Sequence, residues 1–340
     1  MSTASVPTSL ELDAAIEIDR ITQALRSQLS GVLKRRGLVV AMSGGVDSSV
    51  CAALAVRAVG PDRVLGLSLP ERESDDLSLR LAQRWAARLG IEYHIQHIGP
   101  TLEALGCYRE RDAAIRRVVP EFDAAEGWRS KLVLPVDRLR TDRLNVTSLE
   151  VRSPEGVATT VRLPPAEYRQ IVAATNFKQR VRTMVAYYHA DRMHYAVVGT
   201  PNRLEYDQGF FVKGGDGLAD VKPIAHLYKT QVYQLAAALG VPDEIRGRTP
   251  TTETFSLPQT QEEFYFALPV RLLDVVLQAR TAGRPVTAVA EDLEMDSEQI
   301  ARAYLDIDRK RMATAYLHAP PLLVEEIALS APDPRPEATA

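Results

Sequence analysis

Hydrophobic positions in the first hundred residues alternate between strand-like runs and helical spacing. The strand-like runs are short, unbroken and partly β-branched, which is typical of strands buried on both faces. The predicted strands are residues 38–42, 64–69 and 91–98. Apolar residues at helical spacing predict helices over residues 12–33, 47–60 and 76–89 and in a stretch from residue 101. Strands that alternate with helices in this way predict right-handed βαβ units and a doubly wound parallel sheet with flanking helices, an α/β fold.

The pattern continues in the second half of the chain, with one irregular stretch before it. Residues 144–151 and 157–163 alternate between apolar and polar around a Ser-Pro-Glu-Gly turn, which predicts a β-hairpin. This hairpin is either surface decoration or a partner or lid element. The later predicted elements are a helix at 168–190, a strand at 195–200 and helices at 260–279 and 285–314.

These elements predict one main domain with additions. The predicted divisions are an α/β domain over residues 1–270 with an inserted hairpin within 127–165, a helical C-terminal extension over 271–330, and a disordered Pro- and Ala-rich tail over 331–340.

Composition narrows the class of protein. The apolar fraction of 46% is ample for a large core, and the net charge of −3 gives no basic field that would favour nucleic acid. The two cysteines, Cys51 and Cys107, cannot form a disulfide framework and fit a reducing cytosol. We find no signal-peptide pattern and no apolar run near the ~20 residues of a membrane span. We therefore expect a soluble cytoplasmic protein.

The stretch at residues 38–49 carries the clearest chemistry. The first predicted strand stops at Ser43-Gly44-Gly45, and a helix follows from Asp47. Strand, glycine turn and helix start together predict an anion site, because backbone N–H groups and the positive helix end converge on a phosphate. The serine hydroxyls at positions 43, 48 and 49 add donors, and Asp47 is suited to a metal that bridges phosphate oxygens. The alternative is a plain glycine turn between a core strand and its helix.

Residues 43–48, Ser-Gly-Gly-Val-Asp-Ser, resemble the pyrophosphate loop of the N-type ATP pyrophosphatases. The resemblance implies an adenine nucleotide alpha hydrolase-like fold. It also implies that ATP is split between its α- and β-phosphates, which adenylates a substrate and releases pyrophosphate.

Further stretches resemble the NAD synthetases within that superfamily. Residues 69–74 run Leu-Pro-Glu-Arg-Glu-Ser, and residues 176–182 run Asn-Phe-Lys-Gln-Arg-Val-Arg. Residues 199–205, Gly-Thr-Pro-Asn-Arg-Leu-Glu, resemble the family's Gly-Thr-Gly-Asn-Lys-x-Glu. Residues 209–220 resemble its Gly-Tyr-Phe-Thr-Lys-x-Gly-Asp-Gly-x-x-Asp. The match implies an ammonia-dependent NAD synthetase that adenylates the nicotinate carboxylate of deamido-NAD and aminates it.

The resemblance also implies roles for individual residues. The ATP-binding set is Ser43, Gly44, Gly45, Asp47, Ser48, Ser49, Leu69, Arg72, Thr200 and Lys229. The deamido-NAD set is Asn176, Arg180, Lys213, Asp216 and Asp220. Asp47 and Glu205 are the predicted Mg²⁺ ligands, and Asp47, Lys213 and Lys229 are the predicted catalytic residues. For Arg72 the alternative is a solvated loop charge.

The chain departs from the family pattern near its substrate loop. Arg248 replaces a lysine, Thr252-Glu253 replace Ala-Asp, and Gln261 replaces an acidic residue. One alternative is therefore the same adenylation and amidation chemistry on another carboxylate. A second alternative is a non-catalytic nucleotide-binding subunit. The family resemblance implies a homodimer, and nitrogen would come from free ammonia or from a separate glutaminase.

Overall fold

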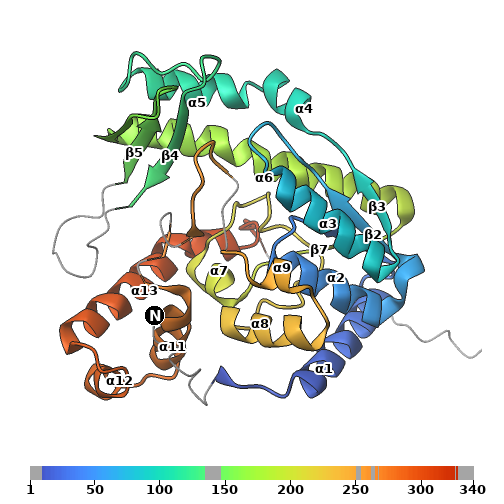
Figure 1. The fold of residues 1–340 in the computed structure, drawn as a ribbon. Coiled ribbons are helices and arrows are strands. Elements are labelled where there is room, and N and C mark those ends of the chain that lie inside the picture. The colour runs from blue at the N-terminus through green and yellow to red at the C-terminus, as the bar shows by residue number, and fades with distance from the viewer. Residues whose placement is uncertain are drawn as a thin grey trace, which may run out of the picture.

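The computed structural model describes residues 10–134, 147–249, 254–261, 265, 266, 268–325 and 327. Its centre is a four-stranded sheet in the order β3-β2-β1-β7, with all neighbouring strands parallel (Figure 1). The strands are β1 (Leu38–Ala41), β2 (Val64–Ser68), β3 (Glu92–Ile95) and β7 (Ala196–Val198). The prediction of a parallel α/β sheet is confirmed.

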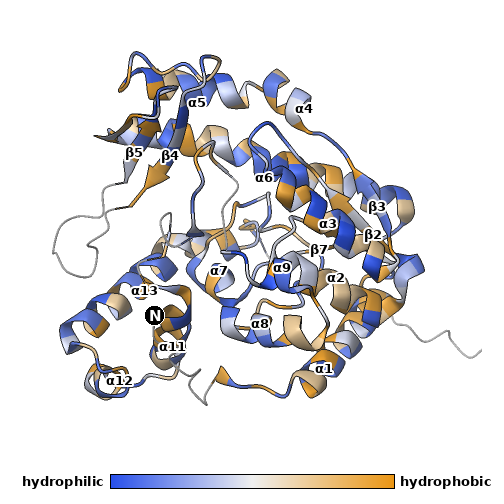
Figure 2. Ribbon diagram, in the orientation of Figure 1, coloured by the Kyte–Doolittle hydropathy of each residue, from blue (hydrophilic) through white to orange (hydrophobic). Residues whose placement is uncertain are grey.

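Helices cover both faces of this sheet. Leu38 and Val40 point into a core on one side and Val39 into a core on the other, and none of the three side chains is exposed. Full burial of such side chains contributes about 1.5–3 kcal/mol each. The first core is closed by α1 (Ala14–Ser27), α2 (Val46–Val59), α3 (Asp76–Leu89) and α8 (Lys229–Ala238). The second is closed by α4 (Gly99–Ala104), α5 (Cys107–Arg116) and α6 (Pro165–Met193). In Figure 2, apolar and polar residues alternate along α3, as expected of a helix with one face on a core.

Local signals explain several helix boundaries. Asp13 caps α1, which continues into a π-helical turn (Gln28–Val32), and Asp75 caps α3, which ends at the left-handed Gly90. A 3₁₀ turn (Pro61–Arg63) leads from α2 into β2.

Two helix predictions in the C-terminal part were wrong. The predicted helix 285–314 is two helices, α12 (Val286–Asp292) and α13 (Ser297–His318), because Glu294 has a φ of +51° and Asp296 caps a new helix. The predicted helix 260–279 is not continuous: Gln261 is helical, residues 262–264 and 267 lie outside the described residues, and Pro269 is the N-cap of α11 (Val270–Thr281).

The predicted hairpin is confirmed over the described residues, since residues 144–146 of the prediction lie outside them, and it belongs to a larger unit. Strands β5 (Ser148–Arg152) and β6 (Ala158–Arg162) pair antiparallel, and β4 (Arg129–Val133), which we did not predict, pairs with β5. Leu132 and Leu149 of this small sheet share a core with Ile115 of α5 and Ile171 of α6. The small sheet therefore packs beside the N-terminal half of α6, as Figure 1 shows.

The C-terminal helices form a fourth core around α11, α12 and α13. Leu204 of α7 (Arg203–Gln208) lies in this core with no exposed surface. A short helix, α9 (Asp243–Arg246), follows α8. The division into residues 1–270 and 271–330 stays a prediction, and the predicted tail 331–340 lies outside the described residues. In the described part of the chain, no helix is both long and apolar enough to cross a membrane.

Candidate active site

The loop after β1 has the shape predicted for a phosphate site. Gly44 has a φ of +75°, and a Cβ atom there would lie 2.3 Å from the carbonyl oxygen of Ser78, so only glycine fits. Gly45 is the N-cap of α2. The Ser48 and Ser49 hydroxyls donate to the carbonyl oxygen of Gly45 at 3.1 and 2.9 Å. The loop is thus held in a turn that presents a helix N-terminus, the geometry that binds phosphate.

Asp47, in the first turn of α2, is held from two sides. The Lys229 ammonium, at the start of α8, pairs with Oδ2 of Asp47, and the Lys229 side chain is only 2% exposed. On the other side, Nδ2 of Asn202 donates to Oδ1 of Asp47 at 3.2 Å. The structure therefore brings together the predicted residues Asp47 and Lys229 from two helices that share one core.

Glu205 joins this group from the end of β7. Asn202 is the N-cap of α7: its side-chain oxygen accepts from the backbone N–H groups of Leu204 and Glu205, at 3.0 and 3.2 Å. In return, the backbone N–H of Asn202 donates to Oε2 of Glu205 at 3.1 Å. Nε2 of Gln261 donates to the other oxygen, Oε1, at 2.9 Å. Since Asn202 contacts both Asp47 and Glu205, the two predicted metal ligands are neighbours. We call these two residues the carboxylate pair.

One ammonium faces both carboxylates of the pair. Burial and the negative charge of Asp47 raise the pKa of Glu205 to about 7, although Lys229 acts to lower it. Burial acts to lower the pKa of Lys229, but the charges of Asp47 and Glu205 outweigh this effect and raise it. The site is short of one positive charge, which favours binding of a cation.

The donor set of the pair fits Mg²⁺. Magnesium prefers oxygen ligands and is usually held by one or two carboxylates together with substrate phosphates and water. Among the residues that the structure describes, no group of three or more His, Cys, Asp or Glu is placed to hold a metal ion. In that mode of binding, Asp47 and Glu205 would hold the metal ion together with phosphate oxygens and water.

Asp274 of α11 anchors the residue that supplies the ammonium. Its carboxylate accepts from the backbone N–H groups of Lys229 and Thr230, at 3.3 and 2.7 Å, and from the Thr230 hydroxyl. Burial raises the pKa of Asp274 to about 6. Sequence reasoning missed both Asp274 and Asn202. The resemblance to the family motif covered Asn202 and could have drawn attention to it, whereas no pattern singled out Asp274.

The end of β2 carries Leu69 and Arg72, which we predicted beside ATP. Leu69 is buried. The Arg72 guanidinium lies 3.8 Å from the centre of the Tyr108 ring, and the Tyr108 hydroxyl donates to Oε2 of Glu71 at 2.8 Å. Arg72 is thus stacked on an aromatic ring and is not a free loop charge. Its contact with ATP, like that of the half-buried Thr200 after β7, stays a prediction.

A second group of charged residues lies next to Arg72, between the end of β2 and helices α5 and α6. We call it the buried charge cluster: Glu71, Glu73, Arg111, Asp112 and Lys178. The Lys178 ammonium donates to Glu71 at 3.1 Å, to Glu73 at 2.5 Å and to the carbonyl oxygen of Thr254 at 2.8 Å. The Arg111 guanidinium binds Glu73 and Asp112. The cluster ties the end of β2 to α5 and α6.

The predicted deamido-NAD residues lie around α6 and the segment after α7. Asn176 is half-buried on α6, and Nε of Arg180 donates to the carbonyl oxygen of Lys213 at 3.3 Å. The Lys213 ammonium donates to the carbonyl oxygens of Tyr316 and Ala319 at the end of α13, at 2.6 and 3.2 Å. Lys213 therefore caps a helix C-terminus in this structure, whereas Lys229 pairs with Asp47.

Asp216 and Asp220 support the same segment. Asp216 accepts from the backbone N–H of Val212 at 2.7 Å. Asp220 accepts from the backbone N–H of Val197 at 2.7 Å and from the Tyr187 hydroxyl at 3.3 Å. Both carboxylates hold the loop to its surroundings, and their contacts with a substrate stay a prediction.

Arg248, in the loop that departs from the family pattern, contacts residues next to the phosphate loop. The Arg248 guanidinium pairs with Asp75 at 3.0 Å and donates to the Ser78 hydroxyl at 2.9 Å. Since Ser78 also packs against Gly44, Arg248 lies close to the phosphate loop. Residues 252 and 253 lie outside the described residues.

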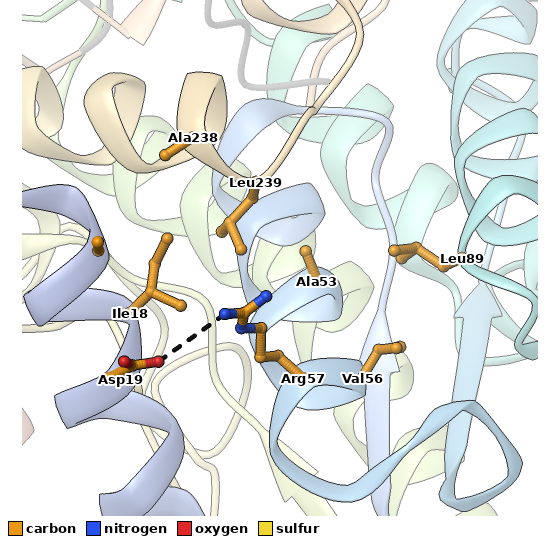
Figure 3. Close-up of a pocket in the computed structure, with 9 residues that line it drawn as sticks. Ile18, Asp19, Ala53, Val56, Arg57, Leu89, Ala238 and Leu239 are labelled. Atoms are coloured by element: carbon orange, nitrogen blue, oxygen red, sulfur yellow. Dashed lines mark ion pairs between the residues drawn. The ribbon is translucent and has the colours of Figure 1, made fainter.

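A groove of about 360 Å³ lies at the opposite end of α2 (Figure 3). Ile18, Ala53 and Leu239 help to line it, and Asp19 and Arg57 form an ion pair of 3.9 Å at its side. None of the predicted site residues lines this groove, so the candidate active site is the polar group at the strand ends.

Comparisons with known proteins identify the family of the chain. A model of the NAD synthase family matches residues 17–120 and 143–319, which leaves residues 121–142, including β4, unmatched. A Mesorhizobium japonicum protein named NH(3)-dependent NAD(+) synthetase is 59% identical over 94% of this chain and 99% of its own length. A Rhizobium meliloti protein of the same name is 54% identical over 94% of both chains.

A solved structure shows the same fold at lower sequence identity. The NMN synthetase from Francisella tularensis has a TM-score of 0.63 and 21% identity, over 92% of this chain and 99% of that chain. The family prediction made from the sequence is confirmed by the family match and by relatives at more than 50% identity over almost the whole chain. The chain belongs to the NAD synthase family.

Proposed function

We propose that the protein is an ammonia-dependent NAD synthetase that uses ATP to convert deamido-NAD to NAD, with AMP and pyrophosphate as the other products. The observation that carries this proposal is the carboxylate pair and its lysine beside a glycine loop at a helix N-terminus. The names and high identity of the two rhizobial relatives support the same substrate.

The first step is adenylation. An oxygen of the nicotinate carboxylate attacks the α-phosphorus of ATP, and the bond to the β-phosphate bridging oxygen breaks, which releases pyrophosphate. The residue 43–49 loop would bind the pyrophosphate through backbone N–H groups, and Lys229 would neutralise its charge. Asp47 and Glu205 would hold Mg²⁺, which would stabilise the negative charge that develops on the phosphates.

The second step forms the amide. Ammonia attacks the acyl carbon of the adenylate, AMP leaves with the oxygen that joined it to the acyl group, and the nitrogen loses a proton. Neither step needs a nucleophilic side chain, so the protein acts by positioning and by charge stabilisation. Asn176, Arg180, Lys213, Asp216 and Asp220 would bind deamido-NAD.

Three further features belong to the proposal. We expect a homodimer, as the family resemblance implies. The nitrogen source is free ammonia or a separate glutaminase. The expected location is the cytoplasm, which is supported by two cysteines that are buried free thiols.

The test is pyrophosphate release from ATP and Mg²⁺ with ammonium, with and without deamido-NAD, and with NAD detected by mass. We expect pyrophosphate and NAD in equal amounts, only when deamido-NAD is present. A parallel assay supplies nicotinic acid mononucleotide, because the Francisella structure is that of an NMN synthetase. Faster turnover of the mononucleotide, or no turnover of deamido-NAD, would overturn the proposed substrate. Replacing ammonium by glutamine tests the nitrogen source.

A further inference from the structure

The Asn202 side chain bridges the two carboxylates of the site. We propose that Asn202 is a positioning residue that holds Asp47 and Glu205 at the separation needed to bind a divalent cation. This inference rests on the proposed function, because it assumes that the carboxylate pair holds the metal. The Asn202 side chain contacts two helices: its oxygen caps α7, and its nitrogen donates to Asp47 of α2 at 3.2 Å.

An amide side chain can cap one helix through its oxygen and donate to a carboxylate through its nitrogen. Ser and Asp also cap helices, but Asp has no donor at neutral pH and Ser is shorter by one bond. Asn202 is 1% exposed, so its amide is shielded from water. Since Asp47 is in the first turn of α2 and Glu205 in the first turn of α7, the amide sets the distance between these two turns.

Each oxygen of the carboxylate pair accepts a hydrogen bond from a described residue. Asp47 accepts from Asn202 through Oδ1 and from Lys229 through Oδ2. Glu205 accepts from Gln261 through Oε1 and from the Asn202 backbone through Oε2. Among the residues that the structure describes, each carboxylate oxygen accepts from one protein donor, and a carboxylate oxygen has a second lone pair that can bind a cation. Gln261, which replaces an acidic residue of the family pattern, donates to Glu205 where a carboxylate would repel it.

Removing such an orienting partner weakens metal binding without removing a ligand. Outer partners of metal ligands typically contribute 10–100-fold to metal affinity or activity. The structure therefore assigns Asn202 a role in cation affinity that is separable from its role as a helix cap.

The test measures binding of Mn²⁺ by its electron paramagnetic resonance signal, in the presence of α,β-methylene-ATP and without turnover. The variants are Asn202→Ser, which keeps a capping oxygen, and Asn202→Ala, which loses both contacts. We expect both variants to bind Mn²⁺ about 10–100-fold more weakly than wild type. Asn202→Ser should melt close to wild type, and Asn202→Ala at a lower temperature. Asp13→Ala, which removes the cap of α1 away from the site, should lower the melting temperature and leave Mn²⁺ binding unchanged.

Two results would overturn the inference. If Asn202→Ser binds Mn²⁺ as tightly as wild type, Asn202 is only a helix cap. If Asp47→Asn binds Mn²⁺ as tightly as wild type, the pair does not hold the cation and the inference fails with it. The substrate assignment is tested separately by NAD formation: a wild-type enzyme that makes no NAD refutes the proposed function, while weaker Mn²⁺ binding by Asn202→Ser still supports the positioning role.

Kinetics give an independent readout. In Asn202→Ser we expect the Mg²⁺ concentration at half-maximal rate to rise about 10–100-fold while the KM for deamido-NAD is unchanged. A fall in kcat that saturating Mg²⁺ does not restore would contradict the positioning role.

Discussion

The carboxylate pair and the buried charge cluster lie at the ends of neighbouring strands, and both combine carboxylates with cations, yet their charge balance differs. In the buried charge cluster, three carboxylates face Lys178 and Arg111, and Nη2 of Arg72 lies 3.9 Å from Glu73, so that three cations balance three acids. In the carboxylate pair, Lys229 pairs with Asp47, and its positive charge also acts on Glu205, so one lysine faces two acids.

The balance decides the protonation behaviour of the two glutamates. Burial acts to raise the pKa of Glu73, but Lys178 and Arg111 outweigh it and lower the pKa. Burial and Asp47 raise the pKa of Glu205. A buried acid whose charge is balanced by neighbouring cations therefore stabilises the fold, whereas an acid with too few neighbouring cations is available to a ligand.

Lys178→Met should have the largest effect, and it should act on stability. The change leaves Glu71 and Glu73 buried with less positive charge, and breaking a buried pair typically costs about 3–5 kcal/mol. Urea unfolding measures this cost. Arg84→Met, which breaks an exposed pair with Glu244, is the matched control and should cost less than about 1 kcal/mol. Equal losses in the two variants would mean that the cluster contributes nothing beyond a surface pair.

Asp47→Ala should act on activity instead. We expect kcat/KM to fall by at least about 10²–10³-fold, the cost of removing one group that stabilises charge in a transition state. The fold should survive, because Asp47 is partly exposed at the start of α2. Circular dichroism and pyrophosphate release check the two halves of this prediction. Retained activity would refute the metal role of Asp47.

The pH dependence of stability should have opposite signs at the two glutamates. For Glu205 the folded pKa of about 7 lies above the ordinary value of 4.5. Its contribution is therefore fully present below pH 4.5 and is lost as pH rises through about 7, on the order of 3 kcal/mol. For Glu73 the folded pKa is lowered, so its contribution is present above pH 4.5 and is lost as pH falls through the folded pKa.

Unfolding from pH 4 to 8 without metal tests this contrast. Glu205→Gln should flatten the loss of stability between pH 4.5 and 7. Glu73→Gln should leave that loss in place and lower stability at neutral pH. If stability falls with pH at the same slope in wild type and in Glu205→Gln, the raised pKa of Glu205 is contradicted.

Asp19→Asn should have the smallest effect. Its ion pair with Arg57 spans 3.9 Å between exposed side chains beside the groove in Figure 3. Exposed pairs contribute about 0–1 kcal/mol, so stability and turnover should both stay near wild type. A large loss of turnover would show that the groove takes part in the reaction.

The parts of the fold that the sequence predicted are those with local signals. The apolar run at 38–42 and the glycines after it predicted β1 and the phosphate loop, because both depend on neighbouring residues. Strand β4 was missed because its pattern is short, with Ser130 and Leu132 as its buried residues. The break between α12 and α13 depends on the single left-handed residue Glu294, which no glycine or proline marks.

The candidate site was predictable in part for the same reason. Asp47, Glu205 and Lys229 lie in family motifs, and the structure brings them together. The contact between Asn202 and Asp47 spans 155 positions in the sequence, and that between Lys178 and Glu71 spans 107. Such contacts arise from the order of the strands. Charged residues usually favour the surface, so no sequence pattern indicates that Lys178 and Glu71 are buried.

The most direct test of the central claim, that ATP adenylates the carboxylate of deamido-NAD, follows oxygen from substrate to product. Deamido-NAD labelled with ¹⁸O in both carboxylate oxygens is converted with ATP, Mg²⁺ and ammonium. The masses of the products are then measured by mass spectrometry. Adenylation predicts one ¹⁸O in each AMP and one in the amide of each NAD. Label in inorganic phosphate, or AMP without label, would show that the carboxylate does not attack the α-phosphorus and would contradict the account.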